Sequence, residues 1–265
     1  MSGQSISPAI RPALASGQSR RSTDRALLSE HGPVLSVVLH LLPGVLTGAV
    51  YLLLRQPVSA AGYPSLVALY LSIPLGLAPI GLGLIVYLGF RRNLRLSLKG
   101  VVLYRDPIQL RRYFVYVPLV FAISLIVILI GQKVLDAALQ TALFGWMPVP
   151  DYGLSGAYSR SVLIVSYMLV AISLPLEVVV EELYFRGFLL PRMRYSGRWT
   201  TPLHSFLYAL YHVWIPWRLV TLAVGMTPLV FAVRRTRNIY VGMIAHALLD
   251  SFYVIFGVAF ILGMR

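Results

Sequence analysis

The chain has 265 residues, of which 58% are hydrophobic and 12% charged, and its mean hydropathy is +0.77. A soluble domain carries about 25% charged residues, so this composition excludes an ordinary soluble domain and predicts an all-α, polytopic transmembrane helical bundle. The chain contains no cysteine, which excludes disulfides, a thiol nucleophile and a cysteine-ligated zinc, and its net charge of +14 points to acidic partners.

The basic excess could serve nucleic acid or anionic lipid. No basic helix and no platform of aromatic and basic residues lies outside the apolar runs, so no nucleic-acid partner is expected. The arginines instead cluster between apolar runs, where the cytoplasmic loops of membrane proteins meet anionic headgroups. We therefore expect the anionic cytoplasmic face of a bilayer as a partner, and nothing in the sequence indicates the oligomeric state.

Residues 1–32 are polar, rich in Ser, Ala and Arg, and lack the apolar core of a signal peptide. They are predicted to form a disordered basic cytoplasmic tail. Residues 33–160 are predicted to form N-terminal membrane helices without an assigned role, and 161–263 a membrane core that carries the function. The apolar runs are continuous rather than alternating, which argues against a transmembrane β-barrel.

Hydropathy predicts about seven spans. They lie at about 34–54, 63–90, 113–131, 161–191, 201–214, 216–233 and 239–262. An eighth span would result if the second run, which contains Pro74 and Pro79, were a re-entrant pair. With seven spans, the basic stretches in 91–112, 192–198 and 234–237 all fall on the side of the N-terminal tail. The excess of Lys and Arg predicts that this side is cytoplasmic.

Several ionisable residues interrupt the late apolar spans, where a charge at the bilayer centre costs roughly 2.5–3.5 kcal/mol on insertion scales. They are Glu177, Glu181, Glu182, Arg186, His212, His246 and Asp250. At 1.5 Å per residue from the basic end of its span, Glu181 lies about 15 Å deep, His212 about 18 Å and His246 about 12 Å. The similar depths predict that the three segments meet in one cavity, open to the cytoplasmic side.

Helical spacing separates the two adjacent glutamates. Glu182 and Arg186 stand four residues apart and can form an ion pair, whereas Glu181 is rotated by about 100° and can face the cavity. His246 and Asp250 are also four residues apart and share one stripe. Glu177 lies one turn before Glu181 on the same face, and the sequence suggests no role for it.

Three motifs in this region resemble one family. "EELYFR" (181–186) matches an EExxxR motif, "SFLYALYH" (205–212) a Phe-x-x-x-His motif with Tyr208 in the aromatic place, and "HALLD" (246–250) a His-x-x-x-Asn/Asp motif. Their order and spacing resemble the CAAX protease and bacteriocin-processing (Abi) family of type II CAAX prenyl endopeptidases. The likeness covers about 161–263.

The resemblance implies a glutamate-dependent intramembrane endopeptidase, similar to CAAX prenyl protease 2. Carried over, Glu181 would be the general base, His212 would orient or polarise water, and His246 with Asp250 would support the oxyanion. Glu182 and Arg186 would be structural, with Arg186 also able to contact substrate. No cofactor is expected. If a metal such as zinc were bound, its ligands would be Glu181, His212 and His246.

The substrate is expected to be a membrane-tethered protein or peptide. A prenylated CAAX protein, a bacteriocin leader and a membrane signalling peptide all remain open. Two other functions compete with proteolysis. Some members of the family act as non-proteolytic membrane scaffolds, and a proton-coupled transporter would also carry intramembrane carboxylates, although no inverted repeat supports it.

Overall fold

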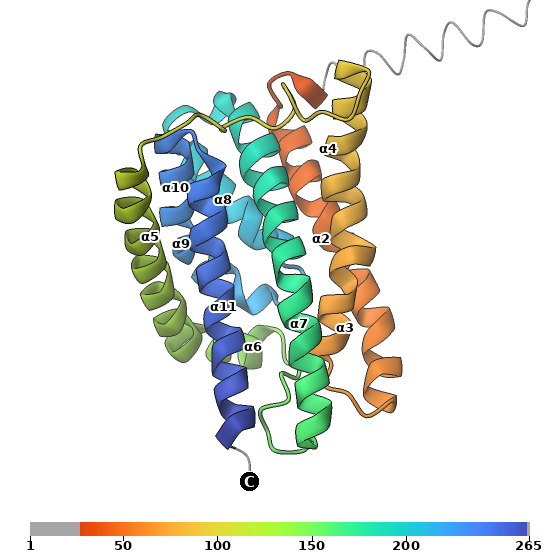
Figure 1. Ribbon diagram of the computed structural model, residues 1–265. Coiled ribbons are helices and arrows are strands. Elements are labelled where there is room, and N and C mark those ends of the chain that lie inside the picture. The colour runs from red at the N-terminus through yellow and green to blue at the C-terminus, as the bar shows by residue number, and fades with distance from the viewer. Residues whose placement is uncertain (1–26, 264–265) are drawn as a thin grey trace, which may run out of the picture.

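The computed structural model describes residues 27–263, and Figure 1 shows them as one bundle of helices. The helices are α2 (Pro33–Ala60), α3 (Leu66–Ser72), α4 (Ala78–Asn93), α5 (Leu110–Gly131), α6 (Ala137–Leu143), α7 (Arg160–Glu181), α8 (Thr200–Tyr211), α9 (Leu219–Gly225), α10 (Thr227–Thr236) and α11 (Ile239–Gly263). Within 27–263 the only β-structure is an isolated bridge between Arg105 and Asn238. The all-α membrane fold predicted from composition is confirmed, and the protein is an integral, multi-pass membrane protein.

Short π-helical and 3-10 turns connect or extend these helices. The π-helical turns are η1 (Ile73–Leu77), η2 (Gln132–Asp136) and η3 (Glu182–Leu189), and the 3-10 turns are η4 (Leu190–Arg192), η5 (Arg194–Trp199) and η6 (Pro216–Arg218). Single π-helical turns inside α-helices occur frequently at functional sites. Two of the three π-helical turns, η2 and η3, contain acidic residues that are buried.

The number of spans differs from the prediction. In 27–263, five helices are long and apolar enough to cross a membrane: Pro33–Ala60, Leu66–Asn93, Leu110–Leu143, Arg160–Arg192 and Ile239–Gly263. A sixth results if Pro216–Gly225 and Thr227–Thr236, which are bent by 41°, count as one span. The predicted span at 201–214 is the 12-residue helix α8. At about 18 Å it is too short to cross a hydrocarbon core of about 30 Å.

The basic stretches lie together at one end of the bundle, as the prediction required. Figure 1 shows the α4–α5 connection running across the end at which α7 finishes and α11 begins. Backbone hydrogen bonds join these segments: Asp106 N donates to Arg237 O (3.1 Å) and Leu103 N to Gly187 O (2.8 Å). Which side of the membrane this end faces stays a prediction.

The predicted tail lies almost wholly outside the described residues. Its last residues are described, and they pack onto the bundle: His31 is buried, and its N–H donates to Arg192 O (2.9 Å). The chain therefore joins the bundle before residue 33, where the first apolar span was expected to begin. This contact holds the start of α2 beside the end of the α7 segment.

Because the chain has no cysteine, single introduced cysteines can test the orientation. We expect Ser59→Cys and Ser155→Cys to react with a membrane-impermeant maleimide in intact cells. We expect Leu96→Cys and Tyr195→Cys, at the basic end, to react only after permeabilisation. All four native side chains are exposed, so access to the reagent is the variable that differs. The reverse pattern would show that the positive-inside prediction is wrong.

Candidate active site

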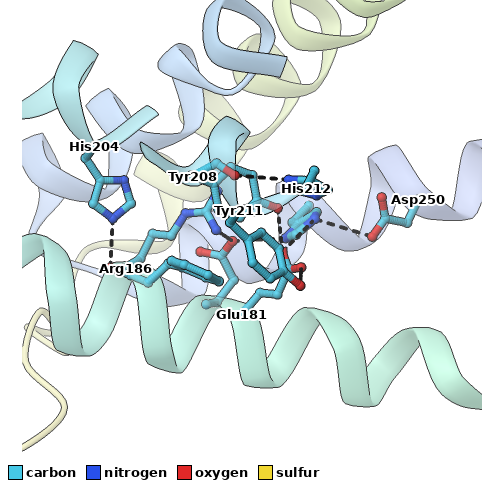
Figure 2. Close-up of polar contacts among 10 residues, drawn as sticks. Glu181, Arg186, His204, Tyr208, Tyr211, His212 and Asp250 are labelled. Carbon is cyan, nitrogen blue, oxygen red and sulfur yellow. Dashed lines mark hydrogen bonds and ion pairs between the residues drawn. The ribbon is translucent and has the colours of Figure 1, made fainter. Parts of the chain in front are cut away.

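Glu181 is the last residue of α7, and its carboxylate is buried and held by two tyrosines of α8. Tyr208 OH donates to Glu181 Oε2, and Tyr211 OH donates to Oε1 (3.0 Å). The two hydroxyls fix both carboxylate oxygens, and an ionised carboxylate retains lone pairs for further donors. Figure 2 shows the three side chains gathered between α7 and α8.

Glu182 faces away from Glu181, as the helical spacing predicted. Its Oε1 lies 3.4 Å from Arg186 Nη1 and 3.0 Å from His246 Nδ1, and both Glu182 and Arg186 are fully buried. The guanidinium of Arg186 also stacks on the Tyr208 ring, with 3.9 Å between its central carbon and the ring centroid. The predicted ion pair is confirmed, and it also orients His246 and Tyr208.

His246 lies between three carboxylates. Its Nδ1 faces Glu182, while its Nε2 lies 3.4 Å from Asp250 Oδ2 and 3.8 Å from Glu181 Oε2. Carboxylate oxygens accept hydrogen bonds, so each of these contacts requires a proton on the ring nitrogen or on the acid that faces it. His246 and Asp250 lie on one face of α11, as their spacing predicted, and their side chains face each other. The link from His246 to Glu182 was not predicted.

His212 was predicted to lie inside a membrane-spanning helix. It lies instead just after the end of α8. Its Nδ1 lies 3.0 Å from the carbonyl oxygen of Tyr208, which can only accept, so Nδ1 carries the proton. In the neutral ring Nε2 then has a lone pair. No residue in 27–263 forms a hydrogen bond with this nitrogen. It can therefore accept a proton or a hydrogen bond from water.

One cavity of about 110 Å³ joins the predicted site residues. Its lining consists of Ile128, Glu177, Glu181, Tyr208, His212, Ile215, Arg218, Leu222, Met226, His246, Leu249, Asp250 and Tyr253. The predicted convergence of Glu181, His212, His246 and Asp250 on one cavity is therefore met, although their catalytic roles stay predictions. Glu177 also lines the cavity, which gives this residue a place but no assigned role.

Sequence reasoning missed the two tyrosines as partners of Glu181. Tyr208 had been noted only as the aromatic residue of the second motif, and Tyr211 not at all. Their spacing was a usable signal, because residues 208, 211 and 212 share one face of a helix. A third missed residue is Arg218, which follows α8 after a short connection and lies in no recognisable motif.

The remaining histidines lie behind the site and do not reach the cavity. The ring centroids of His40 and His204 lie 5.0 Å apart, His40 Nδ1 bonds to Ser36 O (2.7 Å) and His204 Nε2 to Phe185 O (2.9 Å). Both side chains are buried. His40 thus forms a contact between α2 and α8, and His204 fixes the backbone of η3.

The alternative metal site finds no support in the arrangement of side chains. Within the part of the chain that the structure describes, no group of three or more His, Asp or Glu side chains is placed to hold a metal ion. Glu181, His212 and His246 line one cavity, but the oxygens of Glu181 face tyrosines and the nitrogens of His246 face acids, so only His212 Nε2 is left without a partner among residues 27–263. Whether the reaction uses a metal stays untested.

The buried ion pair predicts an asymmetry between single and double substitutions. Glu182→Ala should lower the free energy of unfolding by about 3–5 kcal/mol, because it leaves Arg186 buried without its carboxylate. Glu182→Leu combined with Arg186→Met should cost much less, since no unpaired charge remains. Denaturation in detergent would measure both. Glu30→Ala, which breaks an exposed pair with Arg194, is the control and should change nothing measurable. Equal losses in the single and double variants would contradict the prediction.

Comparison with known proteins adds an independent observation. The family described as "Type II CAAX prenyl endopeptidase Rce1-like" matches residues 160–252, a range that contains all three motifs and every predicted site residue. None of the curated proteins and none of the solved structures compared matches the chain. Residues 160–252, which include the buried glutamate pair and both histidines of the cavity, are therefore similar to the Rce1-like type II CAAX prenyl endopeptidase family.

Proposed function

We propose that the protein is an intramembrane endopeptidase that hydrolyses a peptide bond of a membrane-tethered protein or peptide through a water activated by Glu181. The observation that carries the proposal is the convergence of Glu181, His212, His246 and Asp250 on one cavity within the residues that match the family. Peptide hydrolysis needs a base for water and stabilisation of the developing oxyanion. The cavity supplies candidates for both.

Glu181 and His212 are the proposed pair that activates water. Glu181 takes the proton while the water oxygen attacks the carbonyl carbon, and the π electrons of the C=O bond move onto oxygen. When the tetrahedral intermediate collapses, the C–N bond breaks and the proton passes to the leaving amine. His212 Nε2 has a lone pair that can accept a hydrogen bond from the same water. The two tyrosines keep Glu181 in one orientation throughout.

His246, Asp250, Glu182 and Arg186 form the supporting part of the site. The family resemblance assigns His246 and Asp250 to the oxyanion. In this chain Asp250 faces His246 Nε2, and an ionised Asp has no proton to donate to an oxyanion. We therefore assign Asp250 to holding His246, and Glu182 with Arg186 to holding the other side of the same ring.

The name of the family makes a prenylated C-terminal peptide the first substrate class to test. Bacteriocin leaders and signalling peptides are the alternatives. The positive-inside rule predicts a cytoplasmic N-terminus, and we expect the cavity to open to the same side. A substrate tethered to the inner leaflet would then reach the site without crossing the bilayer.

Substitution of the proposed base tests the function. Glu181→Gln and His212→Ala should each lower cleavage by about 10²–10⁴-fold, the usual contribution of a general base. Comparing membrane peptides that accumulate in cells producing wild type or Glu181→Gln would identify the substrate. Purified protein and a peptide spanning the cleavage site then give the rates. Glu30→Gln, at an exposed ion pair, is the control. Full activity in either site variant would contradict the proposal.

The same variants separate the competing functions. A non-proteolytic scaffold would keep partner binding and cellular function in Glu181→Gln, and no peptide would accumulate. If the protein is a proton-coupled transporter, vesicles containing the wild type would take up substrate. Vesicles containing Glu181→Gln would not. Each result would replace the endopeptidase proposal.

A further inference from the structure

Arg218 is a cavity residue that the proposed mechanism leaves unused. Among residues 27–263, it is the only Lys or Arg that lines the cavity around Glu181. Its backbone is tied to His212 through two successive hydrogen bonds, from Ile215 N to His212 O (3.0 Å) and from Arg218 N to Ile215 O (3.0 Å). The turn that positions His212 therefore also positions Arg218.

A second buried acid holds the Arg218 side chain in place. Arg218 Nε donates to Asp136 Oδ2 (3.3 Å), and Thr221 Oγ1 donates to Asp136 Oδ1 (2.5 Å). The side chains of Arg218 and Asp136 are 17% and 7% exposed, respectively. Asp136 ends the π-helical turn η2, and at Gly131 a Cβ would lie 2.4 Å from Thr221 Oγ1. A glycine there is what lets the third span approach closely enough for Asp136 to reach Thr221.

Asp136 contacts one edge of the Arg218 guanidinium, and the other edge has no protein partner among residues 27–263. Asp136 uses Nε, and the two terminal nitrogens of Arg218 make no hydrogen bond to any residue between 27 and 263. Guanidinium nitrogens carry donors in a fixed planar fork and form strong, charge-assisted hydrogen bonds to anionic oxygens. A fixed cation with unused donors at a cavity is suited to bind a negatively charged oxygen.

The proposed reaction creates such an oxygen, and the donors of the tyrosines and histidines next to Glu181 are engaged. The hydroxyls of Tyr208 and Tyr211 donate to Glu181. His212 Nδ1 faces a carbonyl, and both nitrogens of His246 face carboxylates. An ionised Asp250 offers no proton. Two donor groups remain for the substrate: the charged guanidinium of Arg218 and the neutral hydroxyl of Tyr253, which accepts from Gln132 Nε2 (3.0 Å). A cation stabilises a negatively charged oxygen more strongly than a neutral hydroxyl does.

We propose that Arg218 donates to the oxyanion of the tetrahedral intermediate, and that Asp136 is the positioning residue that fixes it. The proposal rests on the proposed function. The π electrons of the scissile C=O bond move onto oxygen when water attacks, and the terminal N–H groups of Arg218 stabilise the resulting charge. They release it when the C–N bond breaks and the carbonyl reforms. Donors that act on the transition state change kcat rather than substrate affinity.

The test measures kcat and KM separately on a fluorogenic peptide spanning the cleavage site found with Glu181→Gln. Removing one oxyanion donor typically costs about 10²–10³-fold in kcat, so Arg218→Gln should lose that factor with KM unchanged. Arg218→Lys should retain part of the rate, and Asp136→Asn should lose less than Arg218→Gln. Arg237→Gln is the matched control, because Arg237 forms the same kind of pair with Asp106 (2.9 Å) at an exposed position.

Chemical rescue separates catalysis from folding. Guanidinium ion at millimolar concentration should restore part of kcat to Arg218→Ala, which a merely misfolded protein would not show. An unchanged kcat in Arg218→Gln overturns the proposal. So does a rise in KM alone, which would mean that Arg218 binds a carboxylate of the substrate instead. If the wild type cleaves nothing, the proposed function itself fails, an outcome distinct from active wild type with unaffected Arg218 variants.

Discussion

The site depends on the burial of one histidine among acids in an apolar bundle. Isolated charges in such an interior are strongly disfavoured, so each must have a partner. His246 supplies that partner to Glu182 on one side and to Asp250 and Glu181 on the other. Arg186 provides a second positively charged partner for the Glu182 carboxylate. The contacts bind α11 to the end of α7, and no single carboxylate could change without disturbing the others.

Two features of the backbone make this close packing of charge feasible. The change from α-helix to π-helix falls between Glu181 and Glu182, and the rotation of about 100° between successive helical residues turns the two acids toward different partners. On the facing helix, a Cβ at Gly242 would lie 2.5 Å from Glu182 Oε2. On the other side, a Cβ at Gly44 of α2 would lie 2.0 Å from Tyr211 O, so glycine lets α2 support the segment that carries Tyr211 and His212.

The sequence predicted the parts of this structure that local rules determine. Hydropathy and charge predicted the membrane bundle and the common end of the basic stretches, and helical spacing predicted the pairing of Glu182 with Arg186. The prediction of a span at 201–214 was wrong, because hydropathy does not distinguish a membrane-spanning helix from a short apolar helix buried against its neighbours. The hydrogen bonds of Tyr208 and Tyr211 depend on how α8 packs on α7, which no pattern within either helix specifies.

The first spans, which carry no recognisable motif, complete the cavity that the family motifs begin. The family match starts at residue 160, yet Ile128 lines the cavity and Asp136 holds Arg218. Tyr184 OH, next to the glutamate pair, donates to Leu39 O of α2 (2.7 Å). The matched segment by itself would leave η3, Arg218 and one wall of the cavity without these contacts. We therefore infer that residues 33–160 help to hold the site in shape, and we expect a substitution at Asp136 to act on the same cavity as those in the motifs.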